Sequence, residues 1–234
     1  VSQLLQARGM KIAIEAHRRA KPYCMGTLYW QFNDCWPVTS WSSLDYYGNW
    51  KAFHYQAKRS FENVLLSAEV TDSGVYKFFV INDGMQNYAG ELKAEIRNFK
   101  GQLLWEKKAY CKSDASSNVA AILLPFPSLK EIDTQNSYIK LEFISDDNHW
   151  ESNFFFEKPK DLKLSKPDIQ IKTIDELTIE IFSDVLAKDV FLSSENDTFF
   201  EENYFDLLPN EKRIIKLSKP VQNIKVKSLF DTLK

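Results

Sequence analysis

The chain has 234 residues, of which 44% are hydrophobic and 26% are charged, as is ordinary for a globular protein. Its 30 basic and 32 acidic residues leave a formal net charge of −2, which gives no indication of a nucleic-acid or membrane partner. No apolar run approaches the roughly 20 residues that span a bilayer.

A helix–strand–helix pattern opens the chain. Residues 2–20 have helical spacing, with Leu5 and Ile12 on one face. The apolar run Thr27–Phe32 predicts a strand buried on both faces, as in a parallel sheet. Residues 50–61 predict a second helix with one buried face. This is the repeating unit of an α/β barrel, and one unit cannot bury its own apolar faces.

From residue 65 apolar and polar residues alternate, as is typical of strands in antiparallel sheets. About seven short strands over residues 65–160 predict an immunoglobulin-like β-sandwich, and a second, smaller one is predicted over 161–234, behind a linker rich in Lys and Pro. Turn signals separate the strands of the first sandwich, at residues 72–74, 82–84, 100–101, 125–127 and 146–148. The predicted fold is mainly β, with two immunoglobulin-like β-sandwiches preceded by a truncated (β/α) barrel segment over residues 1–64.

Residues Gly26–Trp41 hold the candidate site. Three tryptophans lie there among Asn33 and Asp34, where the predicted strand runs into a loop. Side chains at the C-terminal ends of barrel strands face the active site in α/β barrels. An indole face stacks on the C–H groups of a pyranose ring, and amide and carboxylate groups bind its hydroxyls, so this mixture favours a sugar site. Residue types alone leave open that Trp30 and Trp36 are barrel core.

A resemblance to a known family covers three stretches of the chain. Residues 26–55, which begin Gly-Thr-Leu-Tyr-Trp-Gln-Phe-Asn-Asp-Cys-Trp-Pro, resemble the last strand and last helix of the β-mannosidases of glycoside hydrolase family two. Residues 200–211 resemble the C-terminal immunoglobulin-like domain of these enzymes, with Glu202 and Asn210 in place of an Asp and a Gly. Residues 153–167 resemble the segment between their last two domains.

The resemblance implies a five-domain parent that removes terminal β-linked mannose with retention, so that a mannoside or manno-oligosaccharide is the expected partner. Retention needs two carboxylates about 5 Å apart. In the family these are glutamates on barrel strands that precede Ser2, so no catalytic residue is expected in this chain, which should be inactive alone. Trp30 matches the tryptophan at the floor of the sugar pocket, and Asn33, Asp34 and Trp36 match the loop at its rim.

The sequence indicates neither a metal site nor a cofactor. Its three cysteines lack a Cys-x-x-Cys spacing and are interpreted as free, buried thiols. The cellular compartment stays open, because any export signal would lie before Val1.

Two alternatives remain open. The sandwiches could form an independent carbohydrate-binding or structural module, with the aromatic runs 154–156 and 199–200 as a sugar platform, although packing between strands is the expected role of these runs. The parent could also be another exo-β-glycosidase of the same family, such as an exo-glucosaminidase or a galactosidase. In either case the unpartnered faces of residues 1–64 predict self-association or rearrangement.

Overall fold

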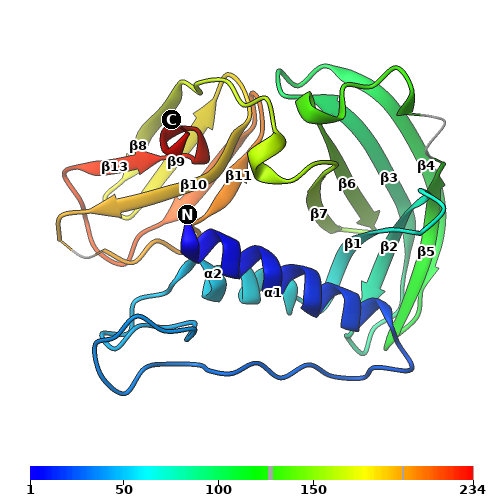
Figure 1. Ribbon diagram of the computed structural model, residues 1–234, viewed down its shortest axis with the longest axis horizontal. Helices are drawn as coiled ribbons and strands as arrows, with labels where there is room; N and C mark the ends of the chain where they lie inside the picture. The colour runs from blue at the N-terminus through cyan, green and yellow to red at the C-terminus, as the bar shows by residue number, and fades with distance from the viewer. Residues whose placement is uncertain (126–128, 197, 234) are drawn as a thin grey trace.

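The computed structural model describes residues 1–125, 129–196 and 198–233, and these contain two α-helices, three short 3-10 helices and thirteen strands (Figure 1). The strands form two β bodies, each built from two antiparallel sheets, so the predicted mainly β fold class is confirmed. The turn predicted at 125–127 includes Phe126 and Pro127, which lie outside the described residues. The division of the chain at residues 64 and 160 stays a prediction.

The two helices, α1 (Ser2–Arg19) and α2 (Ala52–Ser60), pack against each other beneath the two β bodies (Figure 1). Ile14 and Phe53, which are 0% and 1% exposed, are at the centre of the small core between them. Both helices begin and end within two residues of the predicted bounds. Leu5 and Ile12 are exposed, so the apolar face that they share points away from α2.

The structure differs from the prediction at Thr27–Phe32, where the chain is not a strand. A buried strand of a parallel sheet needs a neighbouring strand to pair its backbone groups, and no strand among the described residues pairs with this run. Two of its carbonyls are instead bound by the returning loop: Ser43 N donates to Gln31 O at 3.1 Å and Leu44 N donates to Phe32 O at 2.8 Å.

The first β body joins a three-stranded sheet in the order β1-β2-β5 to a four-stranded sheet in the order β4-β3-β6-β7. Alternation explains its core: Leu92, Ala94 and Ile96 of β3 point inward and are fully buried. The strands are β1 (Val64–Val70), β2 (Tyr76–Asn82), β3 (Tyr88–Asn98), β4 (Leu103–Ser113), β5 (Ser117–Leu124), β6 (Ser137–Ser145) and β7 (Asn148–Phe155).

The second, smaller β body has two three-stranded sheets, in the orders β11-β10-β13 and β12-β9-β8. Its core includes Ile181, Val190 and Phe205. One of its strands, β11, has only three residues, too few to show an alternation period in the sequence. The strands are β8 (Ile169–Asp175), β9 (Thr178–Ser183), β10 (Ala187–Ser194), β11 (Phe205–Leu207), β12 (Lys212–Lys216) and β13 (Ile224–Lys227).

Buried charges attach α1 to the first β body. Arg18 Nε lies 3.0 Å from Asp83 Oδ2, just after β2, and the same guanidinium donates at 2.5 Å to the carbonyl of Ser60 at the end of α2. Glu15, which is 3% exposed, accepts a hydrogen bond from Ser67 Oγ of β1 at 2.8 Å. Burial lowers the pKa of Arg18, although the nearby Asp83 partly offsets this effect. These contacts hold the helical segment in a fixed place against the sheet.

Aromatic and polar contacts attach α2 to the second β body. Phe199 lies against Trp50 and Tyr55, with ring centroids 4.9 and 6.2 Å apart. Tyr55 Oη donates to the Phe200 carbonyl at 3.0 Å, and Arg59 pairs with Glu202 at 3.0 Å. The helical segment therefore contacts both β bodies.

Within the described part of the chain, neither helix is long and apolar enough to cross a membrane.

Candidate functional site

The tryptophan-rich segment Gly26–Trp41 lies in the long connection between α1 and α2, on the side of the helices away from the β bodies (Figure 1). Trp30 is 79% exposed, and Trp36 and Trp41 are 65% and 64% exposed. These indoles are therefore not packed into a core of this chain. A flat apolar surface of this kind is open to a partner or a ligand.

The four residues predicted to bind substrate differ in their exposure to solvent. Trp30, Asn33 and Trp36 are exposed, whereas Asp34 is only 5% exposed. The Asn33 backbone carbonyl accepts a hydrogen bond from Gln31 Nε2 at 2.8 Å, which stiffens the turn between the first two tryptophans. Contact of these residues with sugar stays a prediction.

Both carboxylate oxygens of Asp34 are occupied. Ser40 Oγ donates to Oδ1 at 2.6 Å, Ser42 Oγ donates to Oδ2 at 2.6 Å, and Lys51 Nζ lies 3.2 Å from Oδ2. The hydroxyl bonds from Ser40 and Ser42, helped by the Lys51 charge, lower the pKa of Asp34. The carboxyl group is thus ionised at neutral pH and has no proton to give as a general acid.

A second polar group lies beside the first and is centred on Ser43. Its hydroxyl donates to the Phe32 carbonyl at 2.9 Å and lies 3.1 Å from Tyr29 Oη and 3.0 Å from His54 Nδ1. The His54 ring also packs against the rings of Phe32 and Trp50. Burial lowers the pKa of His54, so this histidine is a neutral packing residue of the loop.

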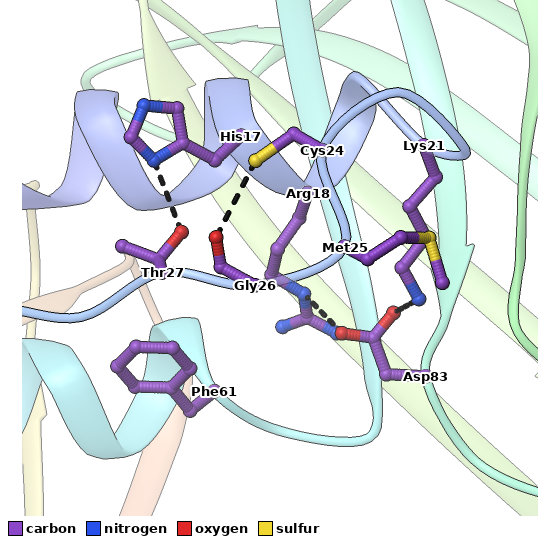
Figure 2. A pocket seen from close by; sticks show the side chains of 9 residues that line it. All are labelled: His17, Arg18, Lys21, Cys24, Met25, Gly26, Thr27, Phe61 and Asp83. Carbon is purple, nitrogen blue, oxygen red and sulfur yellow. Dashed lines mark hydrogen bonds and ion pairs between the residues drawn. The ribbon is translucent and has the colours of Figure 1, made fainter.

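A small cavity near the end of α1 is too small for a sugar ring. Its volume is about 50 Å³, and His17, Met25 and Phe61 are among its lining residues (Figure 2). Figure 2 shows Asp83 between the cationic groups of Arg18 and Lys21, so the two cations already share a carboxylate partner. The space holds at most a few water molecules.

The aromatic runs of the two β bodies are used in packing. Phe154 and Phe156 pack against the core of the first body, and Phe200 is 3% exposed in the core of the second. Phe199 contacts α2 through Trp50 and Tyr55, as described above. These runs are therefore part of the fold rather than an open platform.

The outer face of the β4-β3-β6-β7 sheet carries a ladder of charges. Glu95 of β3 is 2% exposed and is bound by Arg97 at 2.6 Å and by Lys93. Burial by itself would raise the pKa of Glu95, but the hydrogen bonds from Arg97 and Lys93 outweigh it and lower the pKa to about 2.

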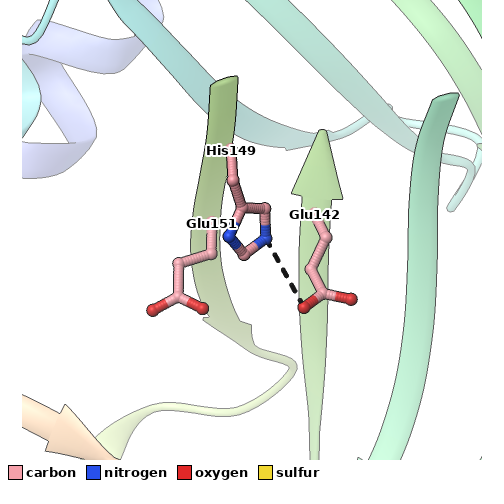
Figure 3. Close-up of side chains that lie close together, drawn as sticks. All are labelled: Glu142, His149 and Glu151. Carbon is pink, nitrogen blue, oxygen red and sulfur yellow. Dashed lines mark ion pairs between the residues drawn. The ribbon is translucent and has the colours of Figure 1, made fainter. Parts of the chain in front are cut away.

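Glu142, His149 and Glu151 lie together on the same face, with one possible metal-ligand atom of each within 4.8 Å of the others (Figure 3). Glu142 and Glu151 are directly opposite each other in the ladder, which is unfavourable for like charges. The Lys140 ammonium lies 3.1 Å from Glu142 and 3.8 Å from Glu151 and offsets this repulsion. A side-chain cation therefore already occupies the neighbourhood of these carboxylates.

The cysteines are free, as predicted, but only Cys111 is buried, and burial raises the pKa of its thiol. Cys35 is exposed because it belongs to the tryptophan-rich loop. Cys24 is only partly buried, so the prediction of three buried thiols is wrong for both Cys24 and Cys35.

The fold and the site together define a class: two successive immunoglobulin-like sandwiches behind a helical segment that displays tryptophans. Residues 74–161 match a family described as a mannosidase Ig/CBM-like domain, and residues 164–232 match a mannosidase family described as an Ig-fold domain.

The chain is similar to known β-mannosidases in both sequence and structure. The β-mannosidase of Rattus norvegicus is 34% identical over 109 residues, which cover 44% of this chain and 12% of that protein. β-Mannosidase A of Aspergillus flavus is 27% identical over 98% of this chain and 29% of its own length. The β-D-mannosidase of Dictyoglomus thermophilum matches in structure with a TM-score of 0.84 and 27% identity, over 97% of this chain and 29% of that one.

Over nearly its whole length the chain corresponds to the C-terminal part of a β-mannosidase of glycoside hydrolase family two. It spans less than a third of the length of these relatives. An exo-chitosanase of Amycolatopsis orientalis also matches, with a TM-score of 0.70 over 97% of this chain and 34% of that one; at 13% identity this likeness shows the fold alone.

Proposed function

We propose that this chain is part of a retaining β-mannosidase, in which it supplies one wall of the sugar pocket and two accessory sandwiches. The observation that carries the proposal is the exposure of Trp30 and Trp36 on a segment that resembles the last barrel strand and loop of β-mannosidases. The names of the relatives support the same substrate class. Trp30 would form the floor of the pocket, Asn33 and Trp36 would form its rim, and Asp34 lies behind them.

The catalytic carboxylates of this proposal belong to the preceding part of the enzyme. Retaining hydrolysis needs a nucleophile and an acid/base about 5 Å apart. The one carboxylate between Trp30 and Trp41 is Asp34, whose lowered pKa does not suit the acid/base role. We therefore expect the isolated chain to be inactive. Turnover of an aryl β-mannoside by the purified chain, abolished by a point substitution within it, would contradict this proposal.

The wall of the pocket is tested in the complete enzyme by Trp30→Ala. Loss of a stacked indole should remove about 2–3 kcal/mol of transition-state binding, which is roughly a 30- to 150-fold loss of kcat/KM for an aryl β-mannoside. Tyr23→Ala is the matched control, because Tyr23 is 97% exposed but precedes the segment. A wild-type rate for Trp30→Ala would remove this residue from the site.

The helical segment leaves apolar side chains exposed to solvent. Leu5 and Ile12 of α1 are 72% and 59% exposed, and they add to the exposed indoles of the loop. In the complete enzyme we propose that the rest of the barrel covers them. The isolated chain is proposed to self-associate through these faces, because large exposed apolar patches find a partner. Sedimentation velocity tests this, and a monomer that keeps the native helical content would refute it.

A further inference from the structure

Asp34 is buried beneath a loop whose neighbouring aromatic side chains are exposed. Its side chain is 3% exposed, and that of its partner Lys51 is 12% exposed. Trp30 and Trp36, which lie four residues before it and two after it, point into solvent. A loop with its large side chains outside has little core of its own, so polar contacts must fix its backbone.

The contacts of Asp34 join three separate pieces of chain. The carboxylate belongs to the outgoing part of the loop, Ser40 and Ser42 belong to its returning part, and Lys51 immediately precedes α2. Ser42 Oγ also lies 2.6 Å from the Leu44 carbonyl and 2.7 Å from Lys51 Nζ, which closes the network. This carboxylate thus links the tryptophan segment to the start of α2, alongside the bonds that Ser43 makes to Phe32 and His54.

The network leaves Asp34 little capacity for a ligand. A carboxylate offers about four lone-pair sites, and two hydroxyls and one ammonium already occupy three of them. Because the Asp34 side chain is only 3% exposed, a sugar hydroxyl could reach the remaining site only by moving a serine hydroxyl out of its buried position, which would leave a polar group without its partner.

We propose that Asp34 is a positioning residue: with Lys51, Ser40 and Ser42 it holds the Trp30–Trp36 loop in the geometry that receives the sugar, without contacting the sugar itself. This inference rests on the proposed function and deepens it. A displacement of about 1 Å of a substrate-binding group costs on the order of 100-fold in rate, so the network affects catalysis from behind the pocket wall.

The experiment compares Asp34→Ala, Lys51→Met and their double variant in the complete enzyme, with kcat and KM measured on an aryl β-mannoside. Each single variant should lower kcat/KM on the order of 10- to 100-fold. The double variant should lose no more kcat/KM than the more damaged of the two single variants, because each single substitution already breaks the same network. If Lys51→Met has wild-type kinetics while Asp34→Ala does not, Asp34 acts on the sugar directly and the proposal is overturned. Additive losses overturn it as well.

The conservative variant Asp34→Asn separates shape from charge. Asparagine keeps an acceptor for Ser40 and a polar partner for Ser42, so it should recover at least half of the lost kcat/KM on a logarithmic scale. Asp45→Asn is the matched control, because the Asp45 carboxylate caps a turn in the same loop through Tyr47 and Asn49 at 2.8–3.0 Å, and these two residues lie outside the Asp34 network. If Asp34→Ala does not fold, Ser42→Ala takes its place with an expected loss of a few-fold, and unchanged kinetics there count against the proposal.

Measuring Trp30→Ala alongside these variants separates a failure of the proposed function from a failure of the positioning role of Asp34. If Trp30→Ala has wild-type kinetics, the proposed function fails and the positioning role fails with it. If Trp30→Ala is slow while the Asp34 and Lys51 variants are normal, only the positioning role is overturned.

Discussion

Lys188 is a buried cation at the junction of the two β bodies, and its removal should destabilise the protein strongly. Its Nζ lies 3.1 Å from Asp206 Oδ1 and 3.5 Å from Asp189 Oδ1, and it lies 4.1 Å from the centre of the Phe155 ring. The side chain is 10% exposed. Lys188→Met keeps an unbranched apolar stem against Phe155 but leaves two carboxylates with no ammonium partner.

The expected loss follows from the charge left behind. Removal of one partner of a buried ion pair costs about 3–5 kcal/mol, because the remaining charge is uncompensated. A thioether next to an aromatic ring replaces part of the lost contact between Lys188 and Phe155. We therefore expect Lys188→Met to lower the free energy of unfolding by about 3–5 kcal/mol at pH 7.

The loss should shrink in acid. Burial alone would raise the pKa of Asp206, but Lys188 and the Asp189 backbone N–H outweigh it, so the pKa lies below its ordinary value. Such a group stabilises the fold above the ordinary carboxylate pKa, and this stability is lost as the pH falls toward the lower folded value. Without Lys188 the pKa of Asp206 rises, and protonation relieves the unpaired charge. The difference in free energy of unfolding between Lys188→Met and wild type should therefore be smaller at pH 3.5 than at pH 7.

The assay is urea unfolding of the chain at the two pH values, followed by tryptophan fluorescence and far-ultraviolet circular dichroism. Lys225→Met is the control, because Lys225 and its partner Glu195 are 66% and 67% exposed and their pairing contributes little. Adding Asp206→Asn to Lys188→Met should recover part of the loss. A Lys188→Met protein within 1 kcal/mol of wild type at pH 7, or one with the same gap at both pH values, would refute this reasoning.

Two further predictions concern the first β body and α1. Gly90→Ala should destabilise the protein by about 1–3 kcal/mol or more, because the new Cβ would lie 1.9 Å from the Ile144 carbonyl oxygen on β6. At Gly9 in α1 a new Cβ would meet nothing within 4 Å, so Gly9→Ala should instead stabilise the protein by about 0.5–1 kcal/mol. The melting temperatures of the two variants should therefore shift in opposite directions from that of wild type. Glu95 has a folded pKa of about 2, below the ordinary glutamate value of 4.5, so it stabilises the fold above pH 4.5 and this stability disappears as the pH falls toward 2. Glu95→Gln should therefore be less stable than wild type at pH 6, by no more than about 3 kcal/mol, and should approach wild type near pH 2.5. Glu91→Gln is the control, because Glu91 belongs to an exposed ion pair on the same strand. If the stability of the two variants has the same pH dependence, the low pKa of Glu95 is not the cause.

Local periodicity in the residue order is enough to predict many of the helices and strands. Alternation located strands such as β3, whose Leu92 and Ile96 face the core, and helical spacing located α1 and α2. The sequence also marked the tryptophan-rich segment, because that mixture of indoles and amides is visible in the order of residues alone. These features need only the two periods of backbone geometry and the residue types themselves.

The surroundings of each residue depend on tertiary contacts. Asp34 and Asn33 are neighbours of similar polarity, yet one is buried under two serines and a lysine and the other is exposed. The run Thr27–Phe32 has the composition of a buried strand but pairs with no described strand, because pairing depends on a partner and not on composition. Burial and pairing are properties of contacts between residues far apart in sequence, and no local pattern contains them.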